Sequence, residues 1–231
     1  MTITPTTLTR LAAVAAVSAG LLFIGVQIGH PHADVTSVTT TEWTVRNSLK
    51  VLMAALALAG ITGMYLRQVK ETGVLGLVGY VLFGVGYLTI MSLAFVSGYV
   101  LPAIAETDPG YVNDVLAAAT NGSATGDIGL VQSALDVSGI GYLAGGLVFG
   151  LALYRARVLA RWASALLAVA SVLTVSLAVL PDAFYRLLAY PNSIAMIGLG
   201  YSLWCTTRTD TDTDAVPTTV DRARLAEAGA E

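Results

Sequence analysis

The sequence predicts an all-α integral membrane protein, a bundle of six transmembrane helices with both termini in the cytoplasm. The first observation is composition: 55% of the 231 residues are hydrophobic and 12% are charged, against about 25% charged in a typical soluble domain. The second is that the apolar residues gather into runs of about 20, the length that crosses a bilayer. The expected helices cover residues 11–29, 44–66, 74–100, 128–153, 158–180 and 183–204, within a transmembrane domain of residues 1–205.

The first apolar segment has the polar start and single Arg10 of a signal peptide. Its apolar run is longer than the usual h-region, and the HPHADV sequence that follows is not a small-residue cleavage site. We therefore expect a retained helix.

The positions of Lys and Arg predict the orientation, because cytoplasmic loops of membrane proteins are enriched in these residues. With the N-terminus inside, the residues on the cytoplasmic side are Arg10, Arg67, Lys70, Arg155, Arg157, Arg161 and Arg208. The long connection 101–126 contains neither Lys nor Arg and belongs outside. The tail, residues 206–231, is polar and acidic, and we expect it to be disordered in the cytoplasm, with one or two fraying helical turns.

The outer connection contains a start signal and a stop signal for a short helix. Asp108-Pro109-Gly110 is typical of a helix start, and Asn121-Gly122 of a helix end. Asn121 also begins a glycosylation sequon, for which an unmodified turn is the alternative interpretation.

The fourth segment combines an acid with many glycines. Asp136 and Gln132 share one helix face, and an acid inside a membrane helix usually faces protein or water, so we expect Asp136 to be buried and paired. Small residues let helices pack closely. At about 100° per residue, Gly141 and Gly145 lie opposite Asp136, which predicts packing on two sides. The glycines assigned to packing are Gly139, Gly141, Gly145, Gly146 and Gly150.

The outer third of the membrane is predicted to hold a polar constellation from three helices. Lys50 and Arg186 are the expected partners of Asp136, because all three lie within roughly 5–12 Å of the outer helix ends at a rise of about 1.5 Å per residue. A pocket there would keep a net positive lining. The candidate ligand-binding residues are Asp136, Lys50, Arg186, Arg46, Asn47, Gln132 and Tyr190.

Three functions remain open for this constellation. A salt bridge that fixes helix register is the structural alternative. The second is binding of a small anionic or zwitterionic molecule, or a lipid headgroup, in an outward-facing and possibly transporter-like pocket. The third is an intramembrane enzyme acting on a lipid-like substrate, with Asp136 as acid or base, for which the sequence offers few partners. We therefore assign no catalytic residue. From the expected burial and pairing of Asp136, we also expect Asp136→Asn to lose more stability than Asp114→Asn.

Several classes of site are excluded by what the sequence lacks. The two histidines, His30 and His32, lie outside the expected helices, and Cys205 is the single cysteine. A helix-bound haem, a CxxC site and a disulfide therefore cannot be built, and we expect no metal and no cofactor. There is no phosphate-binding loop and no basic face for nucleic acid.

Three stretches carry a resemblance: EWTVRNSLKVLMAALALAGITGMYLRQ (Glu42–Gln68), YVLP (Tyr99–Pro102) and ARVLARWASALL (Ala156–Leu167). In these the chain resembles a loose group of uncharacterised prokaryotic six-helix membrane proteins. The resemblance implies a multi-pass architecture and no activity. The expected location is the cell membrane, with the lipid bilayer as partner and a homo-oligomer or a membrane complex as further possibilities.

Overall fold

The computed structural model describes residues 4–29, 31–120, 123–173 and 189–214, and every regular element in these ranges is helical. The long helices are α1 (Pro5–Gln27), α3 (Thr41–Arg67), α4 (Val69–Phe95), α7 (Leu130–Ala156), α8 (Arg161–Leu173) and α9 (Ala189–Asp214). The short ones are α2 (Val35–Val38), the π-helix η1 (Val96–Val100), α5 (Leu101–Ile104) and α6 (Pro109–Ala119).

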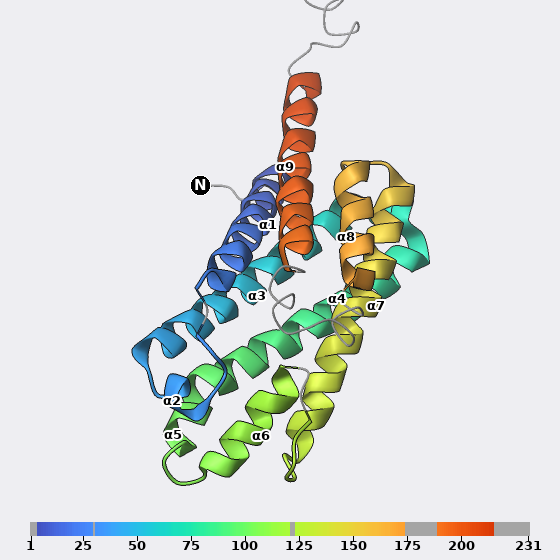
Figure 1. The fold of residues 1–231 in the computed structure, drawn as a ribbon. Helices are drawn as coiled ribbons and strands as arrows, with labels where there is room; N and C mark the ends of the chain where they lie inside the picture. Colours follow the sequence, from blue (N-terminus) through green and yellow to red (C-terminus); the bar gives the residue numbers. More distant parts are fainter. Residues whose placement is uncertain (1–3, 30, 121–122, 174–188, 215–231) are drawn as a thin grey trace, which may run out of the picture.

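The six long helices form a closed ring of neighbours. Starting from α1, each packs against the next in the order α3, α4, α7, α8 and α9, and α9 returns to α1 (Figure 1). In this ring α4 lies between α3 and α7. The order matters for the predicted site, because a pair between Asp136 of α7 and Lys50 of α3 would require these two helices to adjoin.

The N-terminal end of α1 and the C-terminal end of α9 lie at the same end of the molecule (Figure 1). Arg10 Nε donates to Thr207 Oγ1 at 3.2 Å, and the Arg10 guanidinium lies 5.8 Å from the Trp204 ring centroid. The two helices therefore run antiparallel. Which side of a membrane this end faces stays a prediction.

Within the described ranges, four helices are long and apolar enough to cross a membrane: Pro5–Gln27, Thr41–Arg67, Val69–Ile104 and Leu130–Ala156. The fifth expected segment is represented by α8, a shorter apolar helix, because residues 174–180 lie outside the described ranges. The sixth is represented by α9, and residues 183–188 lie outside as well. Helical backbone also continues past Trp204 to Asp214, into the tail where one or two helical turns were expected, and the rest of the tail lies outside the described ranges.

Tight seams join α7 to its two neighbours, and glycine makes them possible. A Cβ at Gly79 of α4 would lie 2.5 Å from the Phe149 nitrogen, and one at Gly141 would lie 2.9 Å from the Gly86 nitrogen. On the other side, a Cβ at Gly150 would lie 2.7 Å from the Ala168 nitrogen of α8. Backbones approach this closely only where a side chain is missing.

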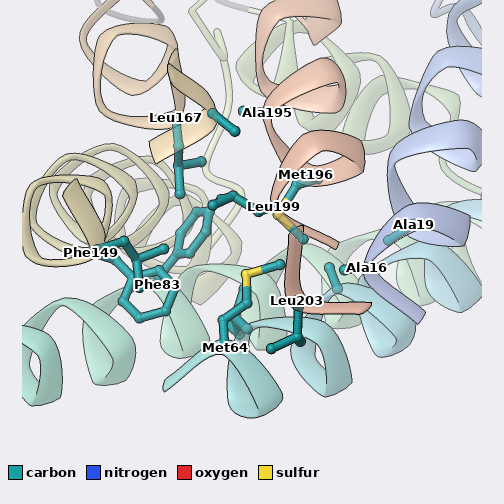
Figure 2. Close-up of a cluster of buried hydrophobic side chains, with 14 of the residues drawn as sticks. Ala16, Ala19, Met64, Phe83, Phe149, Leu167, Ala195, Met196, Leu199 and Leu203 are labelled. Carbon is teal, nitrogen blue, oxygen red and sulfur yellow. The ribbon is translucent and has the colours of Figure 1, made fainter. Parts of the chain in front are cut away.

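A core of larger side chains fills the centre of the ring (Figure 2). Phe83 and Phe149 face Leu199 and Met196 of α9 there, and Met64 reaches in from α3. The backbone of α9 comes close to α1 and α8, whereas α9 meets α4 mainly through side chains. Neighbouring helices in the ring therefore approach backbone to backbone, whereas helices on opposite sides of the ring are separated by side chains.

A second apolar cluster forms a cap at the end opposite the termini. It contains residues of α2, the start of α3, α5, α6 and the approach to α7, among them Trp43, Leu101 and Val112. The expected short helix is α6, and the Asp108 side chain accepts from Tyr111 N at 3.0 Å as its N-cap.

The connection from α4 into the cap is a π-helix with a local cause. Pro102 has no N–H to donate to the Gly98 carbonyl four residues earlier, so the α-helical pattern cannot continue there. The Trp43 indole Nε1 donates to Ser97 O at 2.9 Å, which satisfies a carbonyl in the widened turn.

Candidate functional site

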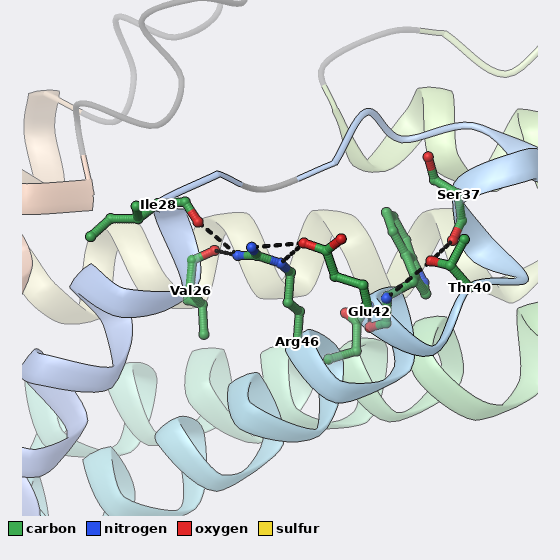
Figure 3. A network of polar contacts seen from close by, with 8 residues as sticks. Val26, Ile28, Ser37, Thr40, Glu42 and Arg46 are labelled. Carbon is green, nitrogen blue, oxygen red and sulfur yellow. Dashed lines mark hydrogen bonds and ion pairs between the residues drawn. The ribbon is translucent and has the colours of Figure 1, made fainter.

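Arg46 is engaged in a structural network at the end of α1 (Figure 3). Its Nη2 lies 2.8 Å from Glu42 Oε1, one turn earlier on α3. Its Nη1 donates to the Ile28 carbonyl at 2.8 Å and to the Val26 carbonyl at 3.4 Å. The last carbonyls of a helix lack partners within the helix, and a basic side chain there also complements the helix dipole. Arg46 thus closes α1, whereas the sequence had placed it in a ligand pocket.

Asn47 and Lys50 lie one turn apart on α3 but differ in surroundings. Asn47 is 2% exposed and its Nδ2 donates to the Trp43 carbonyl at 2.9 Å. A Cβ at Gly98 would lie 2.8 Å from Asn47 Cβ, so Asn47 packs against the π-helix. Lys50 is half-buried and lies in helical register with Ala54, Ala57, Ile61 and Met64, the buried stripe of α3.

The expected burial of Asp136 is wrong. Asp136 is exposed and accepts a hydrogen bond from Gln132 Nε2, also exposed, at 3.0 Å. Among the described residues it forms no ion pair with Lys50, because α4 separates α7 from α3. Val131 and Leu135 turn toward the cap cluster and direct the Gln132–Asp136 face away from it.

The remaining expected residues are dispersed. Tyr190 is half-buried in the first turn of α9, and Arg186 lies outside the described ranges. Gly141 and Gly145 lie against α4, while Gly146 and Gly150 lie against α8. Gly139 is exposed with no atom within 4 Å of a Cβ position, so its assignment to helix packing is wrong within the described chain.

The structure instead singles out Asn192 on α9. Its side chain is 2% exposed, and neither its amide nitrogen nor its amide oxygen has a hydrogen-bond partner. It lies in helical register with Met196, Leu199 and Leu203, which are at most 1% exposed and face the central core. A buried amide left unpaired costs roughly 1–3 kcal/mol, so its position is not explained by packing.

Two tyrosines lie near this amide. The Tyr87 hydroxyl is close to the Asn192 amide, without hydrogen-bond geometry, and is also close to Tyr142. The Tyr87 and Tyr142 ring centroids are 5.7 Å apart, and those of Phe83 and Tyr87 are 4.9 Å apart. Asn192, Tyr87 and Tyr142 form what we call the interior site.

Sequence reasoning missed Asn192 because it followed the charges. In the sixth segment it selected Arg186 and Tyr190 as candidate ligand-binding residues. The available signal was the spacing of Asn192 to Met196, Leu199 and Leu203, which puts an amide on an otherwise apolar stripe.

A separate open hollow of about 410 Å³ lies in the cap, lined by Ser123, Ala124, Gly126, Asp127, Ile128, Gly129 and Gln132. Beside it, Asp114 accepts from Thr125 N at 2.8 Å, Thr125 Oγ1 at 2.9 Å and Gly126 N at 3.1 Å. The backbone hydrogen bond from Thr125 is the main reason that the pKa of Asp114 is lowered from its ordinary value. Asp114 thus anchors the loop before α7.

Within the described ranges, no group of three or more His, Cys, Asp or Glu side chains is placed to hold a metal ion. Comparison of the chain with protein families, curated proteins and solved structures finds no match.

Proposed function

We propose that this chain is a multi-pass membrane protein that holds a small molecule inside its helix ring, at the interior site. The observation that carries the proposal is the Asn192 amide, buried with both polar atoms unpaired. Buried polar groups are nearly always hydrogen-bonded, and departures from such rules are expected at functional or strained sites. A ligand between α4, α7 and α9 would supply the missing partners.

The proposed site lies inside the helix ring and not on the exposed face of α7 that carries Asp136. Arg46 and Asn47 already hold helix ends and helix contacts, so they would bind a ligand only at a cost to the fold. The enzyme alternative has no support around Asp136, whose hydrogen-bond partner is the amide of Gln132 and not a second acid or base.

Native mass spectrometry of the purified chain tests the proposal. We expect the wild-type protein to retain a small molecule and Asn192→Leu to lose it. Ser193→Ala is the matched control, because Ser193 is equally buried on the same turn but its hydroxyl donates to the Ala189 carbonyl. Wild-type protein without a retained species, or equal retention by Asn192→Leu, would contradict the proposal.

A second candidate function, membership of a membrane complex or homo-oligomer, is favoured by the exposed face of α7. Gln132, Asp136 and Gly139 lie on this face without cover from the described helices. The same spectra decide it: a mass of two or more chains, reduced to one by Gly139→Trp, would support association through this face. A single-chain mass for the wild type would contradict it.

A further inference from the structure

We infer that the interior site takes an uncharged ligand whose polar group carries a hydrogen-bond donor and an acceptor side by side, such as a carboxamide. The inference rests on the proposed function and names the class of ligand. It begins from the Asn192 amide, which offers two N–H donors and a carbonyl acceptor, all without partners. One planar group that both donates and accepts satisfies the amide oxygen and nitrogen together.

The absence of charged side chains among the described buried residues argues against a charged ligand. No buried residue in the described ranges carries a formal charge; the buried polar side chains are those of Asn, Gln, Ser and Thr. An ion placed beside Asn192 would lose its hydration and find no opposite charge among these side chains, which is far more costly than burying a paired amide.

The surrounding rings indicate the rest of the ligand. Phe83 lies 4.9 Å from Tyr87 and 5.6 Å from Tyr142, measured between centroids, and both pairs are inclined rather than stacked. Rings arranged in this way present edges and faces to a flat apolar body. We therefore expect an aromatic or unsaturated body attached to the carboxamide, because these rings would contact it.

The test uses three probes of one size: benzamide, benzoate and toluene. Each is titrated by calorimetry into the full chain in lipid nanodiscs, with empty nanodiscs subtracted. We expect benzamide to bind the wild type, at least tenfold more tightly than benzoate. Asn192→Leu should weaken benzamide by about tenfold or more, because a hydrogen-bonding site distinguishes partners by whether the bonds are made. Toluene affinity should stay unchanged or rise.

A control variant keeps this outcome separate from an effect on folding. Ser193→Ala should bind benzamide as the wild type does, because the Ser193 hydroxyl already donates to the Ala189 carbonyl. If benzoate bound as tightly as benzamide and its binding depended on Asn192, the inference of an uncharged ligand would be overturned. The proposed function would still stand. Benzamide that fails to bind, or binds Asn192→Leu equally, would overturn the inference, while native mass spectra still decide the function.

Discussion

At the scale of single residues, Asp114 and Asp136 differ in the number of hydrogen bonds that their carboxylates accept. The loop acid accepts more than the helix acid, the opposite of what the sequence led us to expect. Asp114 accepts three hydrogen bonds from the loop before α7, whereas Asp136 accepts one from a neighbour on its own helix. Carboxylates bonded to backbone N–H groups stabilise the folded state in their charged form. We therefore expect the charge of Asp114 in the cap to stabilise the fold more than the charge of Asp136 on the exposed face of α7.

We predict that Asp114→Asn lowers the melting temperature in detergent more than Asp136→Asn does, reversing the expectation from the sequence. The lowered pKa of Asp114 means that its contribution is present above the ordinary carboxyl value and is lost as pH falls through the folded-state value. Wild-type melting temperature should therefore fall more steeply than that of Asp114→Asn below about pH 4. Parallel pH profiles would contradict the assignment.

Arg157 gives a second residue-scale prediction. It ends α7 with φ 61°, the left-handed conformation that favours glycine. Arg157→Gly should raise the free energy of unfolding by about 0.5–1 kcal/mol. Arg155→Gly, inside the last turn of the same helix, should lower it by about 1 kcal/mol. Chemical denaturation of both variants measures the difference, and a loss of stability in Arg157→Gly would show that its side chain outweighs the strain.

At the scale of elements, the sequence predicts which residues share a face of α7 but not which helices cover that face. Helical geometry alone put Gly141 and Gly145 opposite Asp136, and that is a local property of 3.6 residues per turn. Which helices cover each face depends on contacts with distant segments, so the sequence predicted two neighbours for α7 but not that they are α4 and α8. Helix positions were predictable for the same local reason, and so was the apolar stripe that carries Asn192. The neighbours of the Asn192 amide were not predictable, because they come from other helices.

The glycines of α7 make a matched test of this packing. A Cβ on Gly145 would collide with the Phe83 backbone of α4, while one on Gly139 would meet nothing within 4 Å. Gly145→Ala should therefore lower the melting temperature and loosen the α4–α7 seam. Gly139→Ala should raise the free energy of unfolding by about 0.5–1 kcal/mol, since alanine is the better helix former. Equal effects of the two variants would contradict the packing described here.

At the scale of the whole molecule, the ring has two chemically different ends. The end with both termini contains Arg10, Arg67 and Arg155, while the cap at the other end contains Asp108, Asp114 and Asp127. From the inside-positive tendency of membrane proteins we predict that the ring is oriented with its cap outside. The same orientation would open the cap hollow, lined in part by Gln132, to the exterior.

Cysteine labelling tests this orientation, starting from a Cys205→Ser background that removes the single native thiol. Glu106→Cys introduces an exposed thiol in the cap, and Arg208→Cys introduces one near the end of α9. In intact cells a membrane-impermeant maleimide should label Glu106→Cys and leave Arg208→Cys unmodified until the membrane is permeabilised. The reverse pattern would invert the ring, and labelling of both before permeabilisation would contradict a membrane-spanning arrangement, because the two ends would then share one compartment.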